Sequence, residues 1–88
     1  MLASAPSAGV ELRASGELVA GCGVYNHGGL GLLFVSSAYR RRGLGRLVAA
    51  AVTEAVLASG GAEVFADVRA DNEASLALFQ SLGYCFTR

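Results

Sequence analysis

The sequence has only two cysteines, no lysine and no long uninterrupted apolar run. Cys22 and Cys85 are too few to build a disulfide framework, and the first residues do not resemble a secretory signal. The longest apolar stretch, residues 44–59, contains an arginine, a threonine and a glutamate, whereas a membrane-spanning helix needs ~20 mostly apolar residues. These absences favour a soluble, cytoplasmic protein with reduced thiols and no membrane partner.

The chain is short and rich in apolar residues. Its 88 residues are 53% hydrophobic and 16% charged with zero net charge, which argues against disorder and limits the chain to one small domain. We expect residues 1–8 to form a flexible N-terminus and residues 9–88 to form the domain. A chain this short buries only ~60–65% of its unfolded surface, so a ligand or the second copy of a homodimer would add stability.

The charges are unevenly placed. All seven basic residues are arginines, and four of them lie close together at Arg40, Arg41, Arg42 and Arg46, while the seven acidic residues are spread along the chain. Proteins that bind a nucleic-acid duplex usually carry a broad basic face. A compact cationic region on a neutral body therefore favours one small anionic ligand and argues against a nucleic-acid partner.

Hydrophobic periodicity predicts an α/β domain. The expected strands are residues 10–13, 18–25, 30–35, 64–68 and 84–87; one expected helix runs from Gly43 to Gly60, and another from Asp71 or Asn72 to about Leu82. The first three strands form an antiparallel meander with a hairpin turn at residues 26–29. The remaining order, β-α-β-α-β, implies a mixed sheet in which the apolar third strand is central and covered on both faces.

The spacing of apolar residues also predicts which side chains face the core. In the first helix the apolar stripe consists of residues 44, 47, 48, 51, 52, 55 and 56. In the second helix it consists of Leu76, Phe79 and Leu82. In the fourth strand, residues 64, 66 and 68 share one side, and residues 65 and 67 share the other.

The most informative stretch is the predicted junction between the third strand and the first helix. At a helix N-terminus the first backbone N–H groups have no intrahelical partner, and the helix dipole adds positive charge. Gly43 and Gly45 remove side chains there, and the four arginines add fixed charge, so the junction predicts a site for a diphosphate. The alternative is that the glycines only shape a turn and the arginines are solvated.

Two other phosphate-binding motifs are excluded by the residues that follow. A Walker loop would end in Lys-Ser or Lys-Thr, whereas this loop continues Gly45-Arg46-Leu47. The dinucleotide fingerprint would need a third glycine where Val48 stands, and no acidic residue follows at the distance expected for a ribose contact.

The pattern Arg40-x-x-Gly43-x-Gly45, entered from an apolar strand, resembles the acyl-CoA signature of the GNAT superfamily of N-acyltransferases. A second stretch, from Asn72 to Tyr84, resembles another motif of that superfamily: asparagine, Ser75 three residues on, an aromatic residue seven on, and then Gly-aromatic. The two motifs together are specific. The resemblance covers about residues 9–88 and is nearest in character to the glycine N-acyltransferase-like branch.

The resemblance implies a GNAT-like mixed sheet that binds acetyl-CoA or a related acyl-CoA, with an amine as the acceptor. Main-chain amides of residues 41–46 would hold the pyrophosphate, the strand edge at Phe34 and Val35 would pair with the pantetheine arm, and Asn72 would lie near that arm. The implied cofactor-binding residues are Phe34, Val35, Arg40, Arg41, Arg42, Gly43, Leu44, Gly45, Arg46, Asn72 and Phe79. The amine would attack the thioester directly, helped by proximity and an oxyanion contact near Val35, with no metal. A helix cap is the alternative role for Asn72.

The sequence departs from the superfamily at the positions that move protons. Phe79 stands where the family usually has a tyrosine that can protonate the departing thiolate, so Phe79 is expected to be a packing residue. Tyr84 is a candidate substitute. The predicted catalytic strand has no acidic residue or histidine, which leaves His27 in the preceding turn as a candidate base unless a water molecule mediates that role. Neither cysteine has a spacing that suggests an activated nucleophile.

The chain is also short for this superfamily, because it lacks the N-terminal strand and helices that build much of the acceptor pocket. We therefore expect the acyl-CoA-binding portion of such a domain, either as a fragment of a longer acyltransferase or as a reduced form completed by dimerisation. A module that binds acyl-CoA without turnover is the main alternative to an enzyme.

Overall fold

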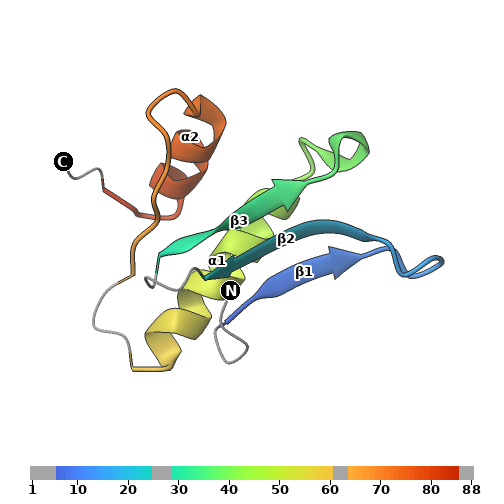
Figure 1. Ribbon diagram of the computed structural model, residues 1–88, viewed down its shortest axis with the longest axis horizontal. Helices are drawn as coiled ribbons and strands as arrows, with labels where there is room; N and C mark the ends of the chain where they lie inside the picture. Colours follow the sequence, from blue (N-terminus) through green and yellow to red (C-terminus); the bar gives the residue numbers. More distant parts are fainter. Residues whose placement is uncertain (1–5, 25–28, 61–63, 86–88) are drawn as a thin grey trace.

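The computed structural model describes residues 6–24, 29–60 and 64–85. Three strands are followed by a short 3₁₀ helix and two α-helices (Figure 1). The elements are β1 (Ala8–Glu11), β2 (Leu18–Val24), β3 (Leu30–Val35), η1 (Ser37–Tyr39), α1 (Leu44–Ala58) and α2 (Glu73–Ser81). The predicted meander and both predicted helices are therefore present, and the fold is α/β as expected.

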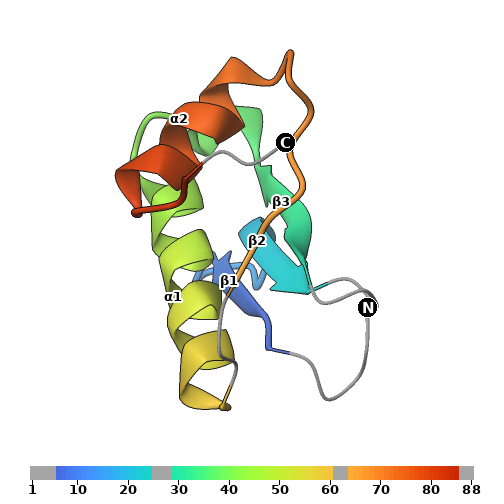
Figure 2. The ribbon, with the colours of Figure 1, turned by 90° about the vertical axis from the view of Figure 1, so that its left-hand side faces the viewer.

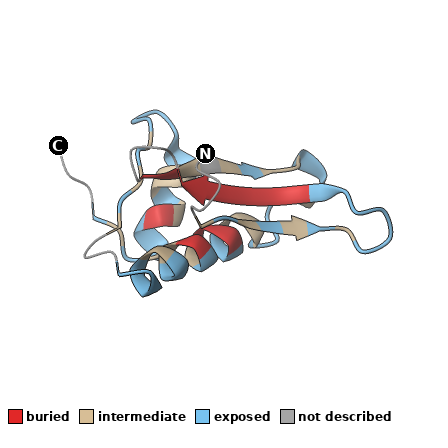
Figure 3. Ribbon diagram, turned by 60° about the horizontal axis from the view of Figure 1, so that its bottom comes forward, coloured by how far each residue is buried: buried red, intermediate tan, exposed pale blue. Residues whose placement is uncertain are grey.

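The sheet has the order β1-β2-β3 with antiparallel neighbours, so β2 is its central strand. The prediction that the third strand is central and covered on both faces is wrong, because Phe34 of β3 is 44% exposed. This prediction failed because it relied on the composition of the strand. β3 is rich in leucine, whereas β2 is buried through small residues, as its nearly continuous buried colour shows in Figure 3.

The fourth and fifth predicted strands are not regular strands in the described residues. Residues 64–68 contribute one parallel bridge, between Leu30 and Ala66, and the Leu30 N–H donates to the Phe65 carbonyl at 2.9 Å. The predicted alternation in this segment is nevertheless confirmed: Val64, Ala66 and Val68 pack against the core, and residues 65 and 67 are exposed. Tyr84 and Cys85 are not in a strand, and residues 86–88 lie outside the described residues, as does most of the predicted hairpin turn.

Both helices pack on the same face of the sheet (Figure 2). The core between the sheet and the helices consists of Ala20, Cys22, Val24, Leu30, Val48, Ala49, Val52 and Phe79. The predicted stripe of α1 is correct at Val48 and Val52 but wrong at Leu47, which is 58% exposed, and at residues 51 and 55, which are also exposed. The apolar residues of α1 lie on several sides of the helix, so their spacing does not define one buried face.

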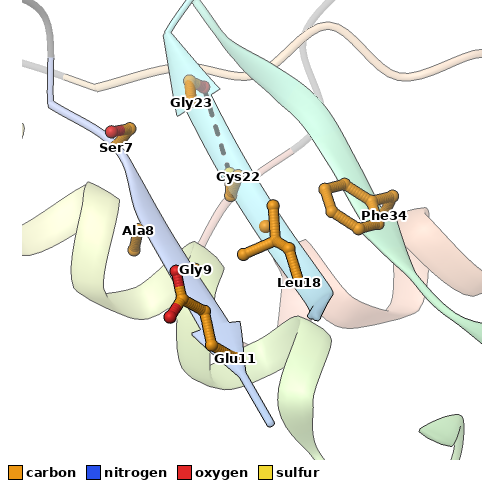
Figure 4. Close-up of a pocket in the computed structure, with 9 residues that line it drawn as sticks. Ser7, Ala8, Gly9, Glu11, Leu18, Cys22, Gly23 and Phe34 are labelled. Atoms are coloured by element: carbon orange, nitrogen blue, oxygen red, sulfur yellow. Dashed lines mark hydrogen bonds between the residues drawn. The ribbon is translucent and has the colours of Figure 1, made fainter. Parts of the chain in front are cut away.

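The opposite face of the sheet carries two large apolar side chains that lie over glycines (Figure 4). A Cβ atom on Gly9 would lie 2.8 Å from Leu18 Cδ1, and a Cβ atom on Gly21 would lie 2.7 Å from Phe34 Cε1. These glycines therefore make room for the neighbouring strand's side chain. Leu18 and Phe34 border a hollow of about 590 Å³ on this face.

Candidate functional site

The segment between β3 and α1 makes the sharp turn that the glycine pattern predicts. Arg41 has φ 64° and Gly43 has φ 78° with ψ 10°, so both adopt left-handed backbone conformations that favour glycine. The first hydrogen bond at the start of α1 runs from the Leu47 N–H to the Gly43 carbonyl at 3.0 Å. Within the described chain, the amides of residues 41–46 donate no hydrogen bond to another protein group. These donors are available to a ligand.

The two glycines of the motif are required for different structural reasons. Nothing lies within 4 Å of a Cβ atom placed on Gly43, so this glycine serves the backbone conformation. A Cβ atom on Gly45 would lie 3.2 Å from Leu78 Cδ1 and 3.4 Å from Val35 Cγ2. Gly45 therefore lets the first turn of α1 approach both β3 and α2.

A cleft of about 740 Å³ opens at this turn, a volume typical of small-molecule sites. Its walls are the C-terminal end of β3, the arginine-rich turn with the start of α1, and one face of α2. Eight of the eleven predicted cofactor-binding residues line it: Phe34, Val35, Arg40, Arg41, Gly43, Leu44, Gly45 and Arg46. The structure thus brings together most of the first motif and the strand before it.

The other three predicted residues do not line this cleft. The Arg42 guanidinium lies over the Tyr39 ring, 5.2 Å from its centroid. Asn72 caps α2, with its Oδ1 accepting from the Ser75 N–H at 3.2 Å, which confirms the helix-cap alternative. Phe79 is buried, and its ring packs edge-on against Tyr84 with centroids 5.0 Å apart, because the core face of α2 points away from the cleft.

No carboxylate of the described residues neutralises the positive charge in the cleft. Among the described residues, none of the four clustered arginines forms an ion pair with a carboxylate. Arg40 Nε donates to the Val35 carbonyl at 3.3 Å, and Arg46 Nε donates to Ser81 Oγ at 3.2 Å. Both acceptors are neutral, so the cleft keeps a positive potential that attracts an anion.

Of the two catalytic candidates, the described residues include only Tyr84, which does not line the cleft. Thr53 Oγ1 donates to the Ala49 carbonyl, so the Tyr84 hydroxyl, 2.8 Å from Thr53 Oγ1, is the donor in that contact. Tyr84 lines a separate hollow of about 610 Å³ beside the C-terminal half of α1. Burial raises the pKa of the Tyr84 phenol above its ordinary value. His27 lies outside the described residues.

Cys22 has the surroundings of an unreactive thiol. The Cys22 Sγ is buried, contacts the Gly31 carbonyl at 3.6 Å, and has its pKa raised by burial, which favours the unreactive thiol. Cys85 is exposed.

The α2 wall of the cleft was not predicted. It is formed by Ala74, Ser75, Ala77, Leu78 and Ser81. Their spacing of one, two, one and three residues places them along one broad side of the helix, next to the side that carries Phe79, and most are small. This small-residue face could have been found in the sequence, because a helix that packs closely on a ligand or on another helix often carries one.

Two features are absent from the described residues. No group of three or more histidine, cysteine, aspartate or glutamate side chains is arranged to hold a metal ion. No described helix has both the length and the apolar character needed to cross a membrane.

Comparison with known proteins places the chain in a family. The family model described as FR47-like protein matches residues 7–87. An X-ray structure of a Drosophila protein superposes with a TM-score of 0.88 and 34% sequence identity, covering 93% of this chain and 28% of that chain. A search among curated proteins gave no significant match. The chain spans little more than a quarter of the length of the Drosophila protein.

The match agrees with the two sequence motifs in both extent and fold. The FR47-like model covers nearly the same residues as the two motifs and the strands and helices between them. The superposition extends over 93% of the chain and therefore over nearly all of its fold. The resemblance to the GNAT superfamily is confirmed, while the glycine N-acyltransferase-like branch stays a prediction. The chain belongs to the FR47-like family of GNAT-related proteins.

Proposed function

We propose that the chain binds acyl-CoA in the cleft and transfers the acyl group to an amine. One observation carries this proposal: the amides of residues 41–46 have no protein partner in the described chain, and they lie in a turn whose arginines no carboxylate neutralises. Free amides at a helix N-terminus together with uncompensated positive charge suit a pyrophosphate. Membership in a GNAT-related family supports the same ligand.

The edge of β3 suits the pantetheine arm, whose amides can pair with a strand. β3 has β2 on one side, and on the other side its pairing with residues 64–68 is a single bridge at Leu30. An extended ligand could therefore add along Phe34 and Val35 in the manner of a further strand. The Arg40 side chain would first have to leave the Val35 carbonyl, to which its Nε donates in the structure.

The proposed reaction is direct aminolysis of a thioester. The amine nitrogen attacks the thioester carbonyl carbon, the C–N bond forms, the C–S bond breaks, and the thiolate of CoA leaves. The nitrogen loses its proton to water or to a water-mediated base, and the thiolate takes a proton from solvent. The chain would contribute proximity and a main-chain donor near Val35 for the oxyanion.

A second candidate function is binding of acyl-CoA without turnover. Two contacts favour it: the Tyr84 hydroxyl is bonded to Thr53 away from the cleft, and the Phe79 ring, which has no proton to give, is buried against Tyr84. Neither residue is positioned in the cleft to protonate a departing thiolate.

Calorimetric titration with acetyl-CoA, followed by an assay of free thiol release with a panel of amines, tests both candidates. Binding with amine-dependent thiol release supports the transferase. Binding without thiol release for any amine selects the non-catalytic module. Absence of acetyl-CoA binding overturns both, and binding of RNA instead would show that the arginines serve a nucleic acid.

A further inference from the structure

Arg46 connects two walls of the cleft. It lies in the first turn of α1, donates its Nε–H to Ser81 Oγ at 3.2 Å, and donates its Nη2–H to the Ser81 carbonyl at 3.4 Å. Ser81 is the last residue of α2, and its own hydroxyl donates to the Leu78 carbonyl at 2.6 Å. Arg46 therefore holds the C-terminal end of α2, where carbonyl groups lack helical partners and a cation is favourable.

This contact is weaker than the one an anionic ligand could offer. Both acceptors on Ser81 are neutral, both distances are long, and the contact is exposed to solvent. The fork of an arginine binds phosphate oxygen atoms at shorter distances and in a bidentate geometry, and the negative charge of a phosphate adds a Coulomb attraction that the neutral acceptors of Ser81 lack. Arg46 lines the cleft beside the free amides of the turn, so a diphosphate there would compete with Ser81 for the guanidinium.

We propose that Arg46 exchanges Ser81 for the ligand's phosphate oxygen atoms when a diphosphate binds, so that binding releases the C-terminal end of α2. The inference rests on the proposed function, because it requires a diphosphate in this cleft. It makes Arg46 a positioning residue whose partner depends on the ligand. By thermodynamic linkage, Ser81 must then weaken ligand binding to the same extent that the ligand weakens the contact between the helices.

Whether the loss of the Ser81 hydroxyl raises or lowers the affinity for pyrophosphate tests the proposal. Ser81→Ala removes one competing acceptor, so the affinity for inorganic pyrophosphate should rise about threefold, as expected for loss of one exposed hydrogen bond. Arg46→Met removes the ligand contact as well and should lower the affinity about tenfold or more. In the Arg46→Met background, Ser81→Ala should no longer change the affinity, because the competition has been removed.

Ser59→Ala is the matched control. Ser59 lies directly after α1, whereas Ser81 is the last residue of α2, and both hydroxyl groups donate to the carbonyl three residues earlier, that of Ser59 to Val56 at 2.8 Å. No arginine of the described chain donates a hydrogen bond to Ser59. Ser59→Ala should therefore leave pyrophosphate affinity unchanged, although both serine variants lose a comparable local hydrogen bond.

Hydrogen exchange gives a second readout. Its rate at the end of α2 would not rise on ligand binding if Arg46 kept its contact with Ser81. The Gly83 N–H donates to the Gln80 carbonyl at the end of α2. Adding pyrophosphate to the unmodified chain should speed exchange of this amide, and in Arg46→Met it should have no such effect.

The possible failures are distinguishable. If the unmodified chain does not bind pyrophosphate, the anion site and the proposed function are both overturned. If the chain binds pyrophosphate but Ser81→Ala binds it equally well or more weakly, the site stands and the exchange by Arg46 is wrong.

Discussion

Leu78 reaches the first turn of α1 because residue 45 is a glycine. A Cβ atom on Gly45 would lie 3.2 Å from Leu78 Cδ1, which is tighter than nine in ten Cβ contacts in proteins. Val35 Cγ2, on the neighbouring strand, would lie only 3.4 Å away. One glycine thus fixes the distance between β3, α1 and α2, and with it the shape of the proposed acyl-CoA cleft.

Gly45→Glu should abolish acyl-CoA binding. The new side chain must displace Leu78 or enter the cleft, and its carboxylate would repel the phosphates. Calorimetry with acetyl-CoA measures the loss.

Gly45→Gln is the matched control, because it adds the same bulk without the charge. We expect Gln to weaken binding and Glu to weaken it further, with the difference shrinking as salt is raised. Unchanged affinity in Gly45→Glu would show that the ligand does not bind at this turn.

The sequence was sufficient to predict the meander, both helices and two of the three walls of the cleft. These features depend on local signals: the periodicity of α1, the glycines at positions 43 and 45, and the asparagine that caps α2. The first motif and the strand before it are contiguous in the chain, so predicting one end of a helix was enough to bring eight site residues together.

The errors concern features that depend on how elements pack. Whether β3 is central is decided by its pairing with residues 64–68, which ends after the Leu30–Ala66 bridge, and no local pattern reveals where pairing stops. Phe79 and Leu78 are adjacent and both apolar, yet one enters the core and the other lines the cleft. The apolar stripe predicted for α2 correctly includes Phe79, but that spacing did not show that the neighbouring side of the helix, with Leu78, would line the cleft.

Tyr84→Phe should lower the free energy of unfolding by about 1 kcal/mol and leave amine-dependent thiol release unchanged. The hydroxyl is bonded to Thr53 at 2.8 Å, and the ring lies outside the cleft, so its role is structural. Urea unfolding and the thiol assay on the same samples measure both quantities.

The double variant Thr53→Val with Tyr84→Phe completes the test. If the two hydroxyl groups stabilise the fold through each other, the two losses should not add. A fall in the rate of thiol release in Tyr84→Phe, at unchanged acetyl-CoA affinity, would instead establish Tyr84 as a catalytic acid.

The stability of the fold should decrease at alkaline pH. Burial raises the pKa of the Cys22 thiol above its ordinary value of 9.0, and that of the Tyr84 phenol above 10.0. As the pH rises through these ordinary values, the unfolded chain loses protons that the folded chain retains, so the unfolded state is favoured. The free energy of unfolding should therefore be level below about pH 8 and fall above pH 9.

The variant Cys22→Ala identifies the first group responsible for this fall. It should be less stable at pH 7 because it leaves a small cavity in the core, but its stability should fall less between pH 8 and pH 10. An equal fall in Cys22→Ala and in the unmodified chain would mean that other groups cause the alkaline loss.

Asn72 provides a test that separates a helix cap from a ligand contact. Asn72→Ala should lower the free energy of unfolding by about 1 kcal/mol, because the Ser75 N–H loses the side-chain oxygen that accepts its hydrogen bond. Asn72→Ser keeps an oxygen that can cap α2 but removes the amide group, so it should retain most of that stability. Since Asn72 does not line the cleft, acetyl-CoA affinity should be the same in Asn72→Ser as in the unmodified chain. A Ser variant that is stable but binds acetyl-CoA more weakly would instead place the Asn72 amide on the pantetheine arm, as the family resemblance implies.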